Sequence, residues 1–109
     1  MFYRGRRLRK NAAIRSMVRE TSLCVQDLIC PLFLVEGMSG KKEISSMPGV
    51  YHYGLDALEE VTAELKDLGI RSVILFGIPE HKDCMGTSAY DDHGIVQEGI
   101  RRLKELDND

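Results

Sequence analysis

The sequence predicts an α/β protein in which two strands alternate with two helices, and three observations support this fold class. Val73 to Phe76 is a continuous apolar run, which is typical of parallel strands covered by helices on both faces. Apolar residues recur every three or four positions from Leu55 to Leu68, the pattern of an amphipathic helix. The connections that leave the strands are long and the return from helix to strand is short, as in β/α-barrel enzymes.

Residues 1–27 are expected to form a basic N-terminal arm that contains one short helix. Residues 1–10 are too highly charged to pack and are expected to be extended. Asn11 can cap a helix that runs to about Glu20, because its side chain can accept a hydrogen bond from a free backbone N–H group.

Residues 28–109 are expected to form two β/α units, the first of which starts with a strand between Leu28 and Val35. Pro31 has no backbone N–H group, so we expect the paired section to run only from Leu32 to Val35. The connection from Glu36 to Gly54 contains several glycines and a proline, and we expect a long loop there.

The helix from Leu55 to Leu68 should end at Gly69, which can adopt a left-handed backbone conformation. The second strand follows almost at once, from Arg71 to Phe76. A right-handed crossover would place the two strands side by side.

The second long loop is expected from Gly77 to His93, and a final helix from Gly94 to Leu106. Gly99 lies inside that helix at a cost of about 1 kcal/mol relative to alanine, which indicates close packing. The residues expected to face inward are Val96, Ile100, Leu103 and Leu106.

The charge is distributed unevenly along the chain. Residues 1–20 hold seven Lys or Arg against one acid, whereas the rest of the chain holds eight bases and sixteen acids. A basic arm can dock on the acidic body of another subunit or bind nucleic acid. We favour subunit docking by Arg4, Arg6, Arg7 and Arg9, because few aromatic side chains accompany the charges.

The overall composition is that of an ordinary globular domain, with 43% hydrophobic and 29% charged residues. No apolar run approaches the roughly 18 residues that span a bilayer, so we expect no membrane partner and a cytoplasmic location. Cys24, Cys30 and Cys84 have no paired spacing, and we expect reduced thiols.

The loop after the second strand gathers ionisable side chains that could suggest a metal site. These residues are His81, Asp83, Cys84, Asp91, Asp92 and His93. No pair has a recognised ligand spacing, so we interpret them as solvated loop residues. Lys82 is a poor candidate for a Schiff base in so polar a loop, because a reactive lysine needs burial to lower its pKa. For Tyr51 to Tyr53 the simple interpretation is packing of the loop.

Phe76 is the strongest candidate for substrate contact. It ends the predicted buried strand at the edge where β/α enzymes place their sites, so it could wall a pocket. From periodicity alone, filling of the core is an equally good interpretation.

Several blocks of the sequence together resemble the start of the porphobilinogen synthase (delta-aminolevulinic acid dehydratase) family. The resemblance covers essentially the whole chain, in order and without large gaps. The blocks are Arg6–Arg9, Asn11–Thr21, Pro31–Phe33, Glu43–Val50, Ile74–Asp83 and Gly94–Gln97.

The resemblance implies a TIM (β/α)8 barrel that condenses two molecules of 5-aminolevulinate into porphobilinogen, in haem biosynthesis, through two Schiff-base lysines. It implies zinc or magnesium in the full-length enzyme and an arm that wraps a neighbouring subunit in an octamer. Phe76 corresponds to an aromatic residue that lines the pocket for one substrate molecule.

The resemblance also implies that the reacting groups lie beyond this chain, which would hold the arm and the first two β/α units of an incomplete barrel. No lysine matches a Schiff-base position, neither Lys41, Lys42, Lys66, Lys82 nor Lys104, and no cysteine matches a metal ligand. We therefore expect no catalytic residue and no bound metal in this chain, and no activity from it alone. The alternative is a non-catalytic module that self-associates through exposed strand edges and the arm.

Overall fold

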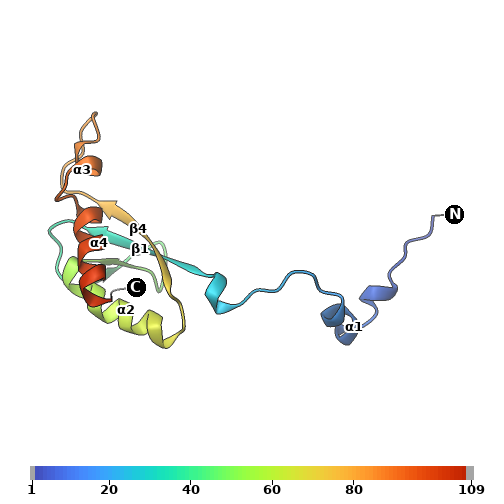
Figure 1. Ribbon diagram of the computed structural model, residues 1–109. Coiled ribbons are helices and arrows are strands. Elements are labelled where there is room, and N and C mark those ends of the chain that lie inside the picture. The colour runs from blue at the N-terminus through green and yellow to red at the C-terminus, as the bar shows by residue number, and fades with distance from the viewer. Residues whose placement is uncertain (1, 108–109) are drawn as a thin grey trace.

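The computed structural model describes residues 2–107, which form a four-stranded sheet with helices on one face and an N-terminal segment that projects away from it (Figure 1). The chain measures 64 × 34 × 27 Å along its principal axes. The helices and strands in chain order are α1 Ala12–Met17, β1 Ile29–Val35, β2 Lys41–Glu43, β3 Tyr51–Tyr53, α2 Leu58–Asp67, β4 Ser72–Ile78, α3 Thr87–Tyr90 and α4 Ile95–Leu106. Short 3-10 turns occur at Arg7–Arg9, Val25–Asp27 and Leu55–Ala57.

The sheet has the order β2-β3-β1-β4. β1 and β4 lie side by side and parallel, from the pair Ile29↔Ser72 to the pair Val35↔Ile78, as the sequence predicted. β3 is parallel to β1 on its other side, and β2 is antiparallel to β3. β4 therefore forms one edge of the sheet among the described residues.

The pairing of β1 begins earlier than predicted, because Pro31 lies inside the paired section. The prediction that pairing starts at Leu32 was wrong. On the other side of β1, β3 pairs only with Phe33 and Leu34. Pro31 therefore has no partner strand on that side, and the absence of its N–H group interrupts no hydrogen bonds there.

The prediction of a loop from Glu36 to Gly54 was incomplete, because this segment contains the two strands β2 and β3. The two strands are joined by a turn in which the Ile44 N–H group donates to the Val50 carbonyl at 2.8 Å. Each strand has three residues, and so short a segment shows no periodicity of its own.

α2 and α4 cover one face of the sheet and close the core. Among described residues, the central cluster is Leu32, Leu34, Leu58, Val61 and Ile95, from β1, α2 and α4. The end of α2 follows the prediction, since Gly69 has a φ of +81° and a left-handed conformation.

α4 lies close to the sheet because of two glycines. A Cβ atom on Gly99 would lie 2.4 Å from Leu34 Cδ1, so the predicted close packing is confirmed. Gly77 of β4 meets α4 in the same way, at 2.6 Å from Val96 Cγ2. The predicted inward stripe was wrong at one position, because Ile100 is 47% exposed whereas Ile95 is buried.

β4 is covered on one face only, so the prediction of a strand buried on both faces was wrong. Val73 and Leu75 pack against the core, whereas Ile74 and Phe76 are each 47% exposed. An apolar run does not reveal how many layers cover it, and here the described helices cover one side.

α1 has the predicted cap but is shorter than predicted. Asn11 Oδ1 accepts a hydrogen bond from the Ile14 N–H group at 2.9 Å. The helix ends at Met17 rather than near Glu20, and the Met17 side chain is 84% exposed. So short a helix, which packs mainly against the neighbouring turn at Arg7–Arg9, has little to sustain further turns.

None of the helices formed by residues 2–107 has the length and apolar character needed to cross a bilayer.

Candidate functional site

The open face of the sheet, on the side away from α2 and α4, carries one row of side chains that crosses all four strands. The register pairs Lys42 with His52, His52 with Phe33, and Phe33 with Phe76. Directly paired residues in a sheet point to the same face, so these four side chains share the open face. We call them the cross-strand row.

Three members of the cross-strand row are ring side chains in contact. The Phe33 and Phe76 rings are stacked, with centroids 5.6 Å apart and an angle of 25° between their planes. The His52 ring meets Phe33 edge-on, with centroids 6.2 Å apart and an angle of 68°. Offset stacked and edge-to-face arrangements are the favourable geometries for such pairs.

Phe76 lies within its strand rather than at its end. β4 continues to Ile78, two residues beyond the predicted boundary. The position nevertheless lies near the carboxyl end of a parallel strand, and the half-exposed ring faces the open side.

Sequence reasoning missed the row because its members come from four separate strands. The sequence alone does not single out Phe33, and it indicates only loop packing for Tyr51 to Tyr53. The signal that could have found Phe33 is its place at the centre of an apolar strand beside Phe76, but the pairing that joins them depends on a register that only the fold supplies.

The loops that leave β1 and β4 are tied together at the carboxyl end of the sheet. The Glu36 N–H group donates to the Ile78 carbonyl at 2.9 Å. The Glu80 N–H group in turn donates to the Glu36 carboxylate at 2.9 Å. One backbone hydrogen bond and one bond to a carboxylate therefore hold the carboxyl ends of β1 and β4 together.

The ionisable loop after β4 is exposed, in agreement with its interpretation as a solvated segment. The Asp83 carboxylate accepts from the Thr87 hydroxyl and from the Thr87 N–H group, and these bonds lower the pKa of Asp83. His93 Nδ1 lies 3.0 Å from the Glu98 carboxylate, and this contact lowers the pKa of Glu98. Asp83 and His93 thus stabilise the loop and the helices next to it through contacts with Thr87 and Glu98.

No group of three or more His, Cys, Asp or Glu side chains in residues 2–107 is arranged to hold a metal ion. The three cysteines are free thiols, as expected. Burial raises the pKa of the half-buried Cys30 thiol, with a smaller contribution from Glu64, which disfavours the thiolate that a metal would bind.

The lysines have the surroundings of surface charges. All five lysines considered as Schiff-base candidates are exposed, namely Lys41, Lys42, Lys66, Lys82 and Lys104. A hydrogen bond to Glu60 raises the pKa of Lys41, the opposite of what a Schiff-base lysine requires. Lys66 forms an ion pair with Asp107 at 2.6 Å.

The arm arginines Arg4, Arg6, Arg7 and Arg9 are exposed, and none forms a salt bridge within the described part of the chain. The Arg4 guanidinium lies over the Phe2 ring at 5.8 Å. Their segment extends away from the sheet (Figure 1), which leaves the charges free to meet another molecule.

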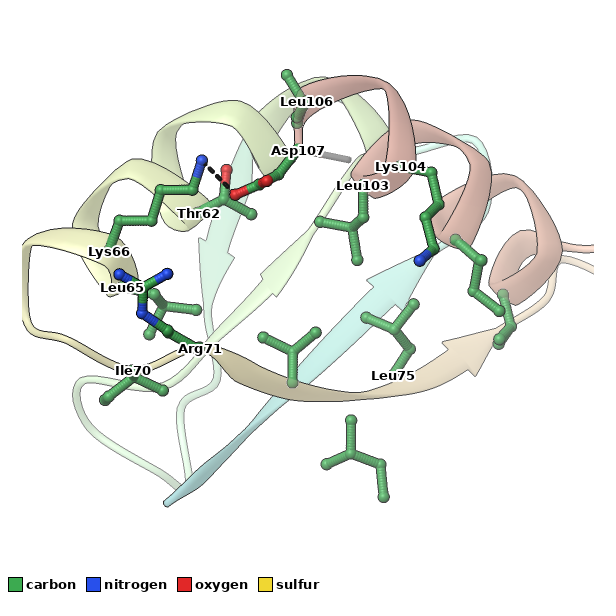
Figure 2. A pocket seen from close by; sticks show the side chains of 14 residues that line it. Thr62, Leu65, Lys66, Ile70, Arg71, Leu75, Leu103, Lys104, Leu106 and Asp107 are labelled. Carbon is green, nitrogen blue, oxygen red and sulfur yellow. Dashed lines mark ion pairs between the residues drawn. The ribbon is translucent and has the colours of Figure 1, made fainter. Parts of the chain in front are cut away.

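A groove of about 580 Å³ lies between α2, α4 and the edge strand β4, and the sequence did not predict it. Figure 2 shows Lys66 and Asp107 meeting across one end of it. Most of its lining is apolar and includes Leu65, Leu75 and Leu103. It holds no arrangement of side chains that suggests a reaction.

Comparison with known proteins gives a consistent result. The family model described as Delta-aminolevulinic acid dehydratase matches residues 2–109. The chain is 58% identical over 104 residues to the delta-aminolevulinic acid dehydratase of Bacillus subtilis, covering 95% of this chain and 32% of that protein. It is 48% identical over 105 residues to the dehydratase of Ruminiclostridium josui, covering 96% of this chain and 51% of that protein.

A solved structure also matches along the whole chain. It is the delta-aminolevulinic acid dehydratase (porphobilinogen synthase) of Toxoplasma gondii in complex with the reaction product porphobilinogen. The TM-score is 0.84 at 32% identity, over 100% of this chain and 31% of the solved chain. The chain thus spans about a third of the length of the first relatives it matches. The chain belongs to the delta-aminolevulinic acid dehydratase family.

Proposed function

We propose that these residues form the first third of a porphobilinogen synthase, which condenses two molecules of 5-aminolevulinate into porphobilinogen with loss of water. The observation that carries the proposal is the match to the T. gondii enzyme, which extends over the whole chain at a TM-score of 0.84. A fold alone does not define an activity, but here the sequence matches relatives named for that activity at 58% identity.

In this proposal residues 1–27 are an assembly arm and residues 28–109 are the first two β/α units of a TIM barrel. β1 and β4 are then the first two barrel strands, and β2 and β3 belong to the long connection between them. The open face becomes the barrel interior, and the groove along β4 receives the next β/α unit. The half-exposed Ile74 and Phe76 support this interpretation, since barrel interiors are filled by side chains.

Phe76 would line the pocket for one substrate molecule. Its half-exposed ring lies near the carboxyl end of β4, on the face that would become the interior. The Schiff-base lysines would come from the part of the family fold beyond these residues, because all lysines of this chain are exposed. A Schiff base needs a positioned lysine of lowered pKa, so we expect the isolated chain to be inactive.

The metal of the proposed enzyme would also be bound elsewhere. The described residues do not provide a ligand set for zinc or magnesium, and we propose no metal step on this chain. We propose cytoplasmic homo-octamers in which Arg4, Arg6, Arg7 and Arg9 contact a neighbouring subunit, with no role in nucleic-acid binding.

A chimaera tests the proposed function directly. Residues 1–109 would replace the corresponding part of the B. subtilis relative, and both the chimaera and the isolated chain would be incubated with 5-aminolevulinate. We expect porphobilinogen from the chimaera and none from the isolated chain. A folded chimaera without activity would overturn the proposal, and turnover by the isolated chain would overturn the assignment of the reacting groups.

A second candidate function is a self-association module, and the exposed edge of β4 favours it. A strand at the edge of a sheet with Ile74 and Phe76 half-exposed can pair with another copy. Sedimentation of the isolated chain at several concentrations tests this function. Concentration-dependent dimers would support it, and a monomer throughout would contradict it.

A further inference from the structure

Phe33 lies at the centre of the cross-strand row. β1 is paired on both sides, and the Phe33 ring contacts the Phe76 ring on one side and the His52 ring on the other. Contacts on two sides restrict the rotamers that a phenylalanine can adopt. The Phe33 ring is therefore the best-fixed ring of the row.

Phe76 has support from one side only. It lies on β4, at the edge of the sheet formed by the described residues, and its ring is 47% exposed. The ring that stacks on it is Phe33, at 5.6 Å. Without that stack, the side chain would be free to sample other rotamers above the open face.

The backbone beneath Phe76 is held from the opposite face. Gly77 approaches α4 so closely that an added Cβ would lie 2.6 Å from Val96 Cγ2 and 2.7 Å from Ile95 Cγ2. The pair Phe33↔Phe76 fixes the register at the same position. What remains to be set is the direction of the ring.

We propose that Phe33 is a positioning residue that fixes the direction of the Phe76 ring, and that it thereby shapes the wall of the pocket. The inference rests on the proposed function in one respect, that Phe76 lines a substrate pocket. Phe33 acts through Phe76 and contributes no reacting group. His52 supports Phe33 from the other side.

The positioning itself is tested on the 109-residue chain without any assay of activity. The chain has three phenylalanines, so ring-labelled phenylalanine gives three sets of NMR signals, of which Phe2 in the arm is an internal reference. We expect ring-to-ring nuclear Overhauser effects between Phe33 and Phe76 in the unmodified chain. Their absence would overturn the inference and requires no variant.

The substitution Phe33→Leu should move the Phe76 ring signals, because the ring current and the stack are lost, while Phe2 stays unchanged. Phe33→Tyr keeps the ring and should preserve the Phe76 signals. Tyr51→Leu is the matched control, since it removes an aromatic residue of β3 from the opposite face. Phe76 signals that do not respond to Phe33→Leu in a folded chain would overturn the inference.

The consequence for substrate is tested in the chimaera by a double-mutant cycle. We expect Phe33→Leu to raise KM for 5-aminolevulinate by about two- to tenfold, the range of a stacked pair, with a smaller change in kcat. Phe33→Tyr should restore KM. Phe33→Leu should add nothing in a Phe76→Leu background, because it acts through that ring.

Additive effects of the two substitutions would overturn the inference and indicate a general packing role for Phe33. The two proposals fail in different ways. An inactive unmodified chimaera counts against the proposed function, whereas the NMR measurement decides the positioning role in either case.

Discussion

The two faces of the sheet differ in what covers them. On the helix face, Leu32 and Leu34 of β1 are almost completely buried beneath α2 and α4. On the open face, Ile74 and Phe76 of β4 are half-exposed although they are equally apolar. The same two strands therefore bury one face in the core and leave the apolar side chains of the other face partly exposed.

The two faces separate the side chains that stabilise the fold from those that are available for binding. Burial of apolar side chains, which drives folding, is concentrated between the sheet and the helices. A half-exposed aromatic row is poorly used for stability, but it suits contact with a further molecule or a further part of the fold. Substitutions on the two faces should accordingly have unequal effects on unfolding.

The largest expected effect separates the two faces directly. Leu34→Ala removes a side chain that is 0% exposed, and we expect the free energy of unfolding to fall by about 2–5 kcal/mol. Ile74→Ala, on the half-exposed face, should cost less than about 1.5 kcal/mol. Urea denaturation of both variants measures the two losses. Equal losses in the free energy of unfolding would show that the two faces contribute equally to stability.

A smaller effect is expected from filling the close approach between β4 and α4. Gly77→Ala places a methyl group 2.6 Å from Val96 Cγ2, and we expect a loss of about 1–3 kcal/mol from overpacking. Gly5→Ala is the control, because its nearest neighbour is 4.0 Å away in the exposed arm. Thermal unfolding of the two variants checks this, and a neutral Gly77→Ala would mean that the helix face can adjust.

The helix face was largely predictable from the sequence, and the open face was not. The period of α2, its end at Gly69 and the tight contact of Gly99 are local signals that the fold retains. The apolar run of β4 gave no information on which side would be covered. β2 and β3 were too short to show a period, and without them His52 could not be placed beside Phe33.

The candidate site shows the same division. Phe76 could be identified by its place near the end of an apolar strand and by the family resemblance. Phe33 and His52 could not, because their role depends on strand register, which is a property of the assembled sheet. Local chemistry reveals single residues, whereas a surface made by several strands requires the fold.

A pH-dependent effect is expected where the connection after β1 meets the start of α2. Hydrogen bonds from the Ser39 hydroxyl at 2.6 Å and from the Gly40 N–H group at 2.9 Å lower the pKa of Asp56. A lowered pKa in the folded state means that the ionised carboxylate stabilises the fold above its ordinary range. This contribution is lost as the pH falls through that range towards the folded pKa.

Asp56→Asn should therefore lower stability at neutral pH, and the difference from the unmodified chain should shrink in acid. Urea midpoints measured from neutral to acidic pH test this, with Asp92→Asn at an exposed loop position as the control. A difference that persists unchanged in acid would show that the charge of Asp56 does not stabilise this connection.

The smallest effect on unfolding is expected from the arm, which belongs to neither face. All residues from 2 to 20 except the half-buried Ile14 are exposed, and the segment extends away from the sheet (Figure 1). Deleting residues 2–20 should therefore change the free energy of unfolding by less than about 0.5 kcal/mol. A loss greater than about 1 kcal/mol would mean that the arm packs on its own body and that the two faces do not account for the stability. In the chimaera, the same deletion should reduce the oligomeric state seen by sedimentation if the arginines dock on a neighbouring subunit. A deletion without effect on either measurement would remove the assembly role of the arm and leave the division between the two faces intact.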